Sequence, residues 1–399
     1  MSWLVYRLTS SAFWLGIVGF TGQIPVFLLT PFAGVLADRM NRHRLLVITQ
    51  TLAMIQALIL SLLVLTGTIA VWQILSLSIF LGIVDAFDMP VRQSFMVKIV
   101  EKKDLGNAIA LNSSMVNSAR LLGPSIAGML IASMGEGMCF LLNGISYLFV
   151  IVSLLAMKIM SKKMESQNTH VLQGIKEGFS YAFSFTPIRS VLLLLALVSL
   201  IGMPYRVLMP IFARDILHGG PHTLGFLMGG SGLGALGGSI YLASRKGVLG
   251  LEKWIALGAT AFGIGLIAFS LSRVFWFSLF LILLASFGVM VQFASSNTVL
   301  QTVVDEDKRG RVMSFYAMAL RGMAPFGSLL AGGLAGKIGA PNTLMIGGVS
   351  CFLGSLVFAR KLPLFREIVR PIYARKGIVS EAVSGIETRT KLTVPPEDE

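Results

Sequence analysis

The chain has few charged residues for its length, and this scarcity indicates its class. Only 13% of its 399 residues are Asp, Glu, Lys or Arg, whereas 55% are hydrophobic and the mean hydropathy is +0.79. A soluble protein carries about twice that share of charge. We therefore predict a membrane protein, and its 42 glycines are typical of helices that pack closely in lipid.

Cysteine and histidine are also scarce. The two cysteines, Cys139 and Cys351, fall near the starts of two different apolar runs, and the four histidines fall in loops. No disulfide framework or metal site follows from such spacing. No nucleophile–base pair, cofactor motif or separate signal peptide is present. We expect no enzyme activity, no metal and no cofactor, and the membrane spans themselves would direct the chain to the membrane.

Acidic residues are fewer than basic ones, which gives a net charge of +14. Such a charge could indicate a nucleic-acid partner. The lysines and arginines, however, lie in short loops between apolar runs rather than on one surface. They indicate membrane topology instead, and we expect no nucleic acid to bind.

Long apolar runs make up most of the chain. A membrane-spanning helix needs about 20 mostly apolar residues, and eleven runs meet this length approximately. We predict an all-α polytopic membrane protein. Its spans are expected at residues 12–36, 45–65, 71–92, 107–133, 138–157, 190–212, 224–243, 253–271, 274–300, 311–336 and 343–359.

Lysine and arginine are distributed unevenly between the loops. Alternate loops carry most of them, and the remaining loops carry far fewer. Cytoplasmic loops are enriched in Lys and Arg, so the basic set is predicted to be cytoplasmic, together with the carboxyl terminus. This set includes Arg39, Arg42, Arg44, Lys98, Lys102, Lys103, Lys158, Lys162, Lys163, Arg245, Lys246, Lys308, Arg309 and Arg311.

The loop between the first two spans carries a motif. It reads GVLADRMNRHR, and its pattern is G-x-x-x-D-R-x-x-R-x-R, formed by Gly34, Asp38, Arg39, Arg42 and Arg44. This resembles the signature of the major facilitator superfamily, although Asn41 stands where that family usually has Gly, and His43 where it has a second basic residue. The alternative interpretation is a basic turn that only fixes topology.

The resemblance implies twelve spans in two six-helix bundles, with both termini inside. Eleven spans place Met1 outside, and the opening MSWLVYRLTSS resembles the last turn of a first helix and its outer loop. We therefore expect most of that first helix to be missing from this sequence.

Matching features recur in the two halves, as related bundles require. R-x-x-x-P occurs at 120–124 and 321–325, and Cys-Phe-Leu opens a late span in each half. We predict an N-terminal bundle at 1–158, a linker at 159–188 with an interfacial helix at 171–185, a C-terminal bundle at 189–361 and a cytoplasmic tail at 362–399. The start of the tail should lie along the inner surface, and its acidic end should be disordered.

The resemblance also implies a conformational gate. In that superfamily the motif aspartate, here Asp38, faces the amino end of a late helix, which we expect to start near 311–313. The dipole of that helix would favour a carboxylate there. This contact would form only in the state open to the outside. Arg39 and Arg42 would then exchange partners with Asp88 as the transporter opens inward.

Asp85, Asp88 and Arg92 share one helical face, because they are spaced by three and four residues. Asp88 and Arg92 either belong to the gate or simply neutralise each other. Asp85 would lie roughly 10 Å inside the inner surface. A carboxylate at that depth is costly and usually functional, so Asp85 is the candidate for proton coupling.

Two arginines, Arg120 and Arg321, are predicted near the middle of the bilayer. A buried guanidinium keeps its proton and needs a partner. Either both line a central cavity and meet the substrate, or they bond to carbonyls loosened by Pro124 and Pro325 or to Asn117. Each of the other polar residues in the spans is either a cavity contact or an interhelical hydrogen bond. They are Gln23, Asn112, Asn117, Gln292 and Asn297.

Small residues and prolines are predicted to shape helix packing. Gly123, Pro124 and Gly128 resemble the G-P-x-x-G element of exporters in the superfamily, and Pro325 is the counterpart of Pro124. The glycine-rich run at 225–238 predicts a close-packed helix. It is no phosphate loop, because no lysine follows with that spacing.

Several segments together resemble the superfamily branch that contains the enterobactin exporter and macrolide efflux proteins. They are LVYRLTSS, GVLADRMNRHR, RLLGPSIAG, CFLLNGISY, KRGRVMSFY and RPIYARKGIV. The resemblance implies a monomeric exporter of an amphipathic small molecule, driven by protons, in a bacterial inner membrane. Two alternatives are a lipid or lysophospholipid flippase on the same fold and a non-transporting membrane scaffold or receptor.

Overall fold

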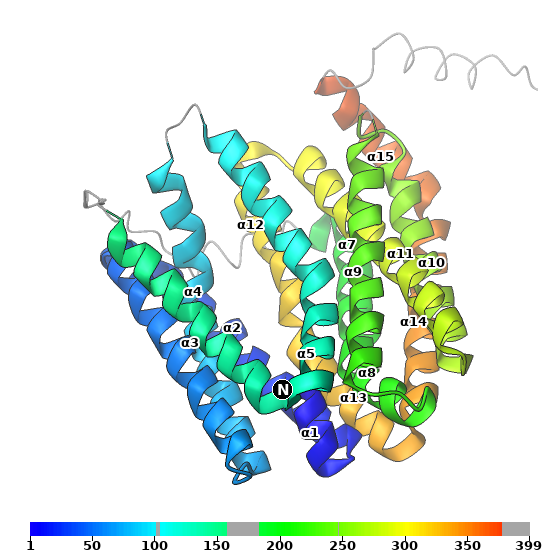
Figure 1. The fold of residues 1–399 in the computed structure, drawn as a ribbon. Helices are drawn as coiled ribbons and strands as arrows, with labels where there is room; N and C mark the ends of the chain where they lie inside the picture. Colours follow the sequence, from blue (N-terminus) through cyan, green and yellow to red (C-terminus); the bar gives the residue numbers. More distant parts are fainter. Residues whose placement is uncertain (101–103, 158–182, 246, 377–399) are drawn as a thin grey trace, which may run out of the picture.

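The computed structural model describes residues 1–100, 104–157, 183–245 and 247–376, and every regular element in these ranges is a helix (Figure 1). A bilayer offers no partners for backbone N–H and C=O groups, so apolar segments satisfy them within helices. The first half holds α1 (Ser2–Thr9), α2 (Ala12–Arg39), α3 (Arg42–Leu65), α4 (Val71–Ile99) and α5 (Leu105–Ala156).

The second half continues the helical chain. It holds α7 (Thr186–Leu197), η1 (Val198–Gly202), α8 (Tyr205–Ile211), η2 (Phe212–Ile216), α9 (Pro221–Ala243), α10 (Leu251–Leu271), α11 (Phe275–Val303), α12 (Glu306–Ala317), η3 (Met318–Gly322), α13 (Ala324–Ile338), α14 (Ala340–Arg360) and α15 (Leu362–Arg375). The η segments are π-helical turns inside longer rods, a feature that often occurs at functional sites.

Nine helices in the described part of the chain are long and apolar enough to cross a membrane. One of them, Gly106–Ala156, is bent at Gly135 into two arms. The rod formed by α12, η3 and α13 is not among the nine. When both arms and this rod are included, the structure contains the eleven spans predicted from the apolar runs.

A glycine with positive φ makes the turn before the last span of each half. Gly135 has φ 83° and ψ 167°, and Gly339 has φ 84° and ψ 156°. Other residues rarely adopt this backbone conformation. The shared turn agrees with two related halves. The predicted Cys-Phe-Leu repeat is wrong, because Cys139 closely follows Gly135 whereas Cys351 lies midway along α14.

The two halves lie side by side, with the first half on the left in Figure 1 and the second on the right. Two helix pairs form the most extensive contacts between them: α2 packs against α13, and α5 packs against α9. We call these pairs the two seams. Within the halves, α2 packs on α4 and α3 on α5, as α9 packs on α11 and α10 on α14.

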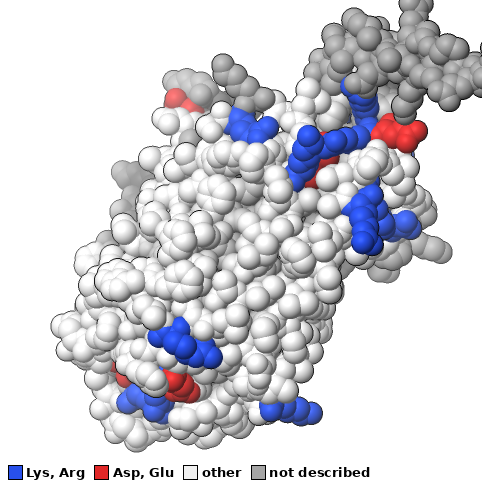
Figure 2. Space-filling model, turned by 90° about the vertical axis from the view of Figure 1, so that its right-hand side faces the viewer, with Lys and Arg blue, Asp and Glu red and all other residues white. Residues whose placement is uncertain are grey.

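Charged side chains on the visible face of the second half gather at its two ends and leave an uncharged belt between them (Figure 2). Such a belt is the surface that a bilayer covers. We call the end that holds the 40–41 turn and α15 the basic end, because most of the lysines and arginines lie in its loops. The end that holds Gly135 and Gly339 is the opposite end.

Helix α15 covers the basic end of the second half. Phe365, Val369 and Tyr373 are buried, and the Nε of Arg366 lies 2.9 Å from Oε1 of Glu252 on α10. The interfacial helix predicted at 171–185 lies almost entirely outside the described residues, as does the acidic end of the tail.

Candidate functional site

The signature motif spans the end of α2 and the start of α3. The side chain of Asn41 accepts hydrogen bonds from the backbone N–H groups of His43 and Arg44, at 3.1 and 3.3 Å. Asn41 therefore caps α3. The ring of His43 bonds to the backbone oxygen of Leu154, at 2.6 Å, and stacks on Phe95. At this motif position an imidazole joins three helices where the superfamily usually has a basic residue.

The gate contacts predicted for the remaining motif residues are not seen in the described part of the structure. The side chains of residues 34–39 lie outside the described part of the structure, so the predicted contacts of Gly34, Asp38 and Arg39 lie outside it too. Arg44 is exposed, and Arg42 is half-buried. The predicted start of the late helix near 311–313 is wrong, because α12 begins at Glu306. The polar segment EDKRGR extends that helix by more than a turn.

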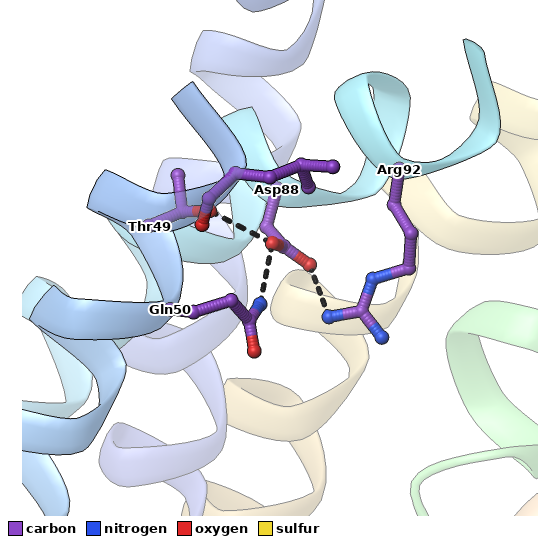
Figure 3. Close-up of polar contacts among 5 residues, drawn as sticks. Thr49, Gln50, Asp88 and Arg92 are labelled. Atoms are coloured by element: carbon purple, nitrogen blue, oxygen red, sulfur yellow. Dashed lines mark hydrogen bonds and ion pairs between the residues drawn. The ribbon is translucent and has the colours of Figure 1, made fainter. Parts of the chain in front are cut away.

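Asp88 is the centre of a buried polar network (Figure 3). Its Oδ1 accepts hydrogen bonds from Thr49 Oγ1 at 2.8 Å and from Gln50 Nε2 at 2.7 Å, and its Oδ2 lies 2.6 Å from Nη2 of Arg92. Buried charges are stable when they are paired and hydrogen-bonded in this way. In this conformation Asp88 and Arg92 therefore neutralise each other, as one of the two alternatives predicted. Two residues of α3 also donate hydrogen bonds to Asp88.

Asp85 differs from Asp88 although it lies less than one turn away on α4. Its side chain is exposed, and no hydrogen bond or ion pair joins it to a described residue. A carboxylate that reaches water without a fixed partner can take up and release a proton. The surroundings of Asp85 thus allow the proton-coupling role that the sequence predicts.

Arg120 and Arg321 are both exposed. Nη1 of Arg321, in η3, lies 2.9 Å from Sδ of Met89 on α4, so this side chain crosses from one half to the other. Arg120 has no hydrogen bond or ion pair within the described residues. Neither guanidinium bonds to Asn117 or to a carbonyl loosened by proline in that part of the chain, which favours the interpretation that both line a space between the halves.

The predicted polar contacts separate into different groups. A cavity of about 430 Å³ between α5 and α9 is lined by Asn117 together with Ser114, Ser118 and Ser239. Asn112 is exposed, and Asn297 accepts a hydrogen bond at 2.8 Å from Gln301 of its own helix. Gln23 is exposed and donates across the α2–α13 seam to Ser328, at 3.4 Å.

Gln292 is a wrong prediction for the cavity. Its side chain is 0% exposed, and neither of its polar atoms has a hydrogen-bond partner. Its backbone nitrogen lies 2.8 Å from the place that a Cβ on Gly258 would occupy. Gln292 is therefore enclosed beside α10. The sequence could not show this, because α11 is apolar on all sides and no periodicity marks the face that α10 covers.

The family described as "Transmembrane secretion effector", a branch of the major facilitator superfamily, matches residues 1–373. The chain belongs to this family. It is therefore a multi-pass membrane transporter of small molecules, and its relatives are transporters rather than enzymes.

Curated relatives cover nearly the whole transporter. The staphyloferrin A transporter of Staphylococcus aureus is 27% identical and is matched over 91% of this chain and 92% of its own length. The multidrug efflux pump Tap of Mycolicibacterium fortuitum is 24% identical, over 92% and 91%. Macrolide efflux protein A of Streptococcus pyogenes is 21% identical, over 90% and 89%.

Solved structures share the fold of this transporter. The nucleoside transporter NupG superposes with a TM-score of 0.72 at 11% identity and covers 90% of this chain and 93% of its own. A bacterial homologue of ferroportin in an inward-facing state gives a TM-score of 0.66 at 18% identity, over 90% and 92%. At these identities the likeness concerns the major facilitator fold alone.

Both seams of the transporter close through glycine pairs near the opposite end. A Cβ on Gly16 of α2 would lie 2.8 Å from Cα of Gly332 on α13, and a Cβ on Gly128 of α5 would lie 2.8 Å from Cα of Gly225 on α9. Such backbone contact requires glycine. Gly128, predicted to serve helix packing, lies at this backbone contact, whereas Gly123 has no atom within 4 Å of a Cβ placed on it.

The other packing residues also lie at the seams. A Cβ on Gly225 would lie 2.7 Å from the carbonyl oxygen of Pro124, and Pro325 is buried in the first turn of α13. In the glycine-rich α9, Gly225, Gly229 and Gly232 face α5. Glycines 230, 234 and 238 face α11 instead. The prediction of a close-packed helix is therefore confirmed on two faces.

A polar latch also joins the halves at the opposite end. The hydroxyl of Tyr6, on α1, donates to Oδ2 of Asp215, in η2. Nη1 of Arg214 lies 3.4 Å from the backbone oxygen of Tyr6 and 3.5 Å from Oγ of Ser10. We call Tyr6, Ser10, Arg214 and Asp215 the latch. No sequence pattern predicted the latch, because its partners lie more than 200 residues apart in the chain.

One further residue inside a span was missed. Arg206, in α8, is an exposed arginine within the span Thr186–Ile216. Its Nε donates to the hydroxyl of Tyr205 at 3.3 Å. The signal was available, because a charged residue far inside an apolar run is rare and usually functional.

Proposed function

We propose that this transporter exports amphipathic small molecules from a bacterial cytoplasm across the inner membrane in exchange for protons, as a monomer. The observation that carries the proposal is an asymmetry between the ends. Both seams close by backbone contact near the opposite end, while a cavity lies between α5 and α9 farther along the seam toward the basic end. The excess of Lys and Arg assigns the basic end to the cytoplasm. This conformation is then open inward.

The exported substrate class follows from the relatives and from the cavity. Names of the relatives include a siderophore transporter, a multidrug pump and a macrolide efflux protein. The cavity opens widely to its surroundings, and its Ser and Asn side chains would meet polar groups of a substrate. We place Arg120, Arg321 and Gln23 in the path of the substrate, because they are exposed at the seams or between the halves. Asn117 is half-buried and joins them because it lines the cavity.

The cytoplasmic gate is the motif loop. When the halves rock, the end of α2 approaches α12, and Asp38 meets the first turns of that helix. Lys308, Arg309 and Arg311 lie there. The helix dipole attracts the carboxylate, and these cations offset the negative charge of Asp305 and Glu306 at the same helix start. Asp88 is engaged by Arg92 in the inward-open state, and Arg39 or Arg42 would take over that pairing in the other state.

We expect Asp85→Asn to remove proton coupling, since an amide cannot carry a proton through the cycle. In everted membrane vesicles, wild-type transporter should accumulate rhodamine B ethyl ester when a pH gradient is imposed. The variant should lose this gradient-driven accumulation by about tenfold or more and keep downhill exchange of the dye. The measurement is dye accumulation with and without the gradient.

Glu367→Gln is the matched control, because this carboxylate is exposed on α15 and is not part of the proposed path. It should pump like wild type. An Asp85→Asn variant that still responded to the gradient would remove Asp85 as the carrier. Movement of a labelled lysophospholipid between leaflets, without dye transport, would favour the flippase. Absence of any flux, with the protein folded in the membrane, would favour a scaffold or receptor.

A further inference from the structure

Arg206 is a charged group in an uncommon place. It lies ten residues before Ile216, the end of its span, which corresponds to a depth of about 15 Å at 1.5 Å per residue. Its side chain is exposed, although the helix that carries it packs against helices of both halves. A charged side chain this far inside a span usually faces the bundle interior or a water-filled recess rather than lipid.

The neighbouring residues place this recess between the halves. Helix α8 contacts α2 of the first half as well as α13 and α9 of the second. The next residue, Val207, lies 3.4 Å from the place of a Cβ on Gly19 of α2. Gln23, one turn farther along α2 toward the basic end, is also exposed. Arg206 thus lies beside the closed α2–α13 seam.

A buried network of hydroxyl groups holds the guanidinium in place. Tyr205 is 1% exposed, and its oxygen lies 2.7 Å from Oγ of Ser231 and 3.3 Å from Oγ of Ser286. Ser286 in turn donates to Ser231, at 2.8 Å. Three helices therefore fix the tyrosine, and its oxygen accepts the Nε–H of Arg206.

The remaining part of the guanidinium has no partner in the part of the chain that the structure describes. Within the described residues, the interactions of Arg206 are its Nε bond and the 5.8 Å approach of its Cζ to the Tyr205 ring. No carboxylate of these residues pairs with it, and its two terminal nitrogens are left to solvent. A guanidinium in a partly dry recess binds planar oxyanions through two parallel hydrogen bonds.

We infer that Arg206 binds a carboxylate of the exported molecule, with Tyr205 as the residue that positions the guanidinium. This inference rests on the proposed export function and makes its substrate class narrower. Arg206 offers two N–H donors at a fixed orientation, and a carboxylate offers two oxygens with matching spacing. A neutral amphipathic molecule would gain only the apolar contacts.

The test compares two dyes that differ in one group: rhodamine B, which has a free carboxylate, and its ethyl ester. Binding to purified full-length transporter is measured by fluorescence anisotropy. Wild type should bind rhodamine B about tenfold more tightly than the ester. Arg206→Gln should remove this preference and leave the affinity for the ester unchanged. Arg206→Lys should retain part of it, because an ammonium group cannot form the bidentate pair.

Two further variants separate binding from folding. Arg273→Gln removes an arginine that, among the described residues, hydrogen-bonds to nearby backbone oxygens alone, and it should behave like wild type. Tyr205→Phe should weaken rhodamine B binding by severalfold and spare the ester. Unchanged rhodamine B affinity in Arg206→Gln, or equal loss for both dyes, would overturn the inference. If wild type extrudes the ester but binds both dyes equally, only this inference is wrong. If it neither binds nor extrudes either dye, the proposed function is wrong too.

Discussion

Replacing Gly128 with valine should reduce transport severalfold or more and leave the transporter folded in the membrane. A Cβ at this position would lie 2.7 Å from the backbone oxygen of Pro221 and 2.8 Å from Cα of Gly225. Both contacts are with backbone, so no side chain can rotate away. Overpacking of this kind costs about 1–3 kcal/mol, and the cost falls only on the state in which the opposite end is closed.

The expected result is a transporter held open to the outside. A cost of that size changes the ratio of the two states by about 5- to 150-fold, and cycling should fall to about a fifth of wild type or less. Accessibility gives the second readout. The measurement uses a transporter without Cys139 and Cys351 that carries Ser328→Cys. This cysteine should react with an impermeant thiol reagent from outside when Gly128→Val is also present, and only slowly when Gly128 is retained.

A variant at the other seam and a control variant test whether closure of the seams is required. Gly16→Val should act in the same way at the other seam, where a Cβ would lie 2.8 Å from Cα of Gly332. Gly123→Ala should transport normally, because nothing lies within 4 Å of a Cβ there. Normal transport by both Gly128→Val and Gly16→Val would show that the seams are not required to close.

Breaking the latch should have the second-largest effect. Tyr6→Phe and Asp215→Asn each weaken the bond between α1 and η2 across 209 residues of sequence. A hydrogen bond to a charged group contributes about 1.5–3 kcal/mol, and the exposure of Asp215 places this bond at or below the lower figure. The outward-open fraction should rise by up to about tenfold, with a corresponding rise in labelling at Ser328→Cys from outside.

The latch should persist at alkaline pH. Burial, together with the bond to Asp215, raises the pKa of Tyr6 well above its ordinary value. The hydroxyl therefore keeps its proton and remains a donor as the pH rises. Tyr241→Phe is the matched control, because that hydroxyl meets Arg245 within the second half. If both latch variants label like this control, the latch does not hold the two halves together.

The sequence predicted the spans of this transporter well for a physical reason. A run of about 20 apolar residues has little alternative to a helix across the bilayer, and Asn41, Gly135 and Gly339 mark helix ends through their caps or turns. The signature motif and the exporter-like element at 123–128 then indicated the superfamily, which the family match confirmed.

The side-chain partners could not be predicted in the same way. Asp88 takes Thr49 and Gln50 from a neighbouring helix, and Tyr6 takes Asp215 from the other half. Such pairs depend on which face of an apolar helix meets which neighbour, and periodicity is weak when all faces are apolar. Weak periodicity is also the reason that Gln292 was predicted to line the cavity, although its side chain is buried.

The most direct test of alternating access measures both ends at once in one transporter. Spin labels at Met40 and Glu306 report the basic end, and labels at Thr68 and Lys337 report the opposite end, by double electron–electron resonance. We predict that addition of rhodamine B ethyl ester or a change of pH shortens one distance as the other lengthens. We also predict that Asp38→Asn loses the short distance at the basic end. If the two distances never change in opposite directions, or if Asp38→Asn retains the closed basic end, rocking of two halves with an Asp38 gate is wrong.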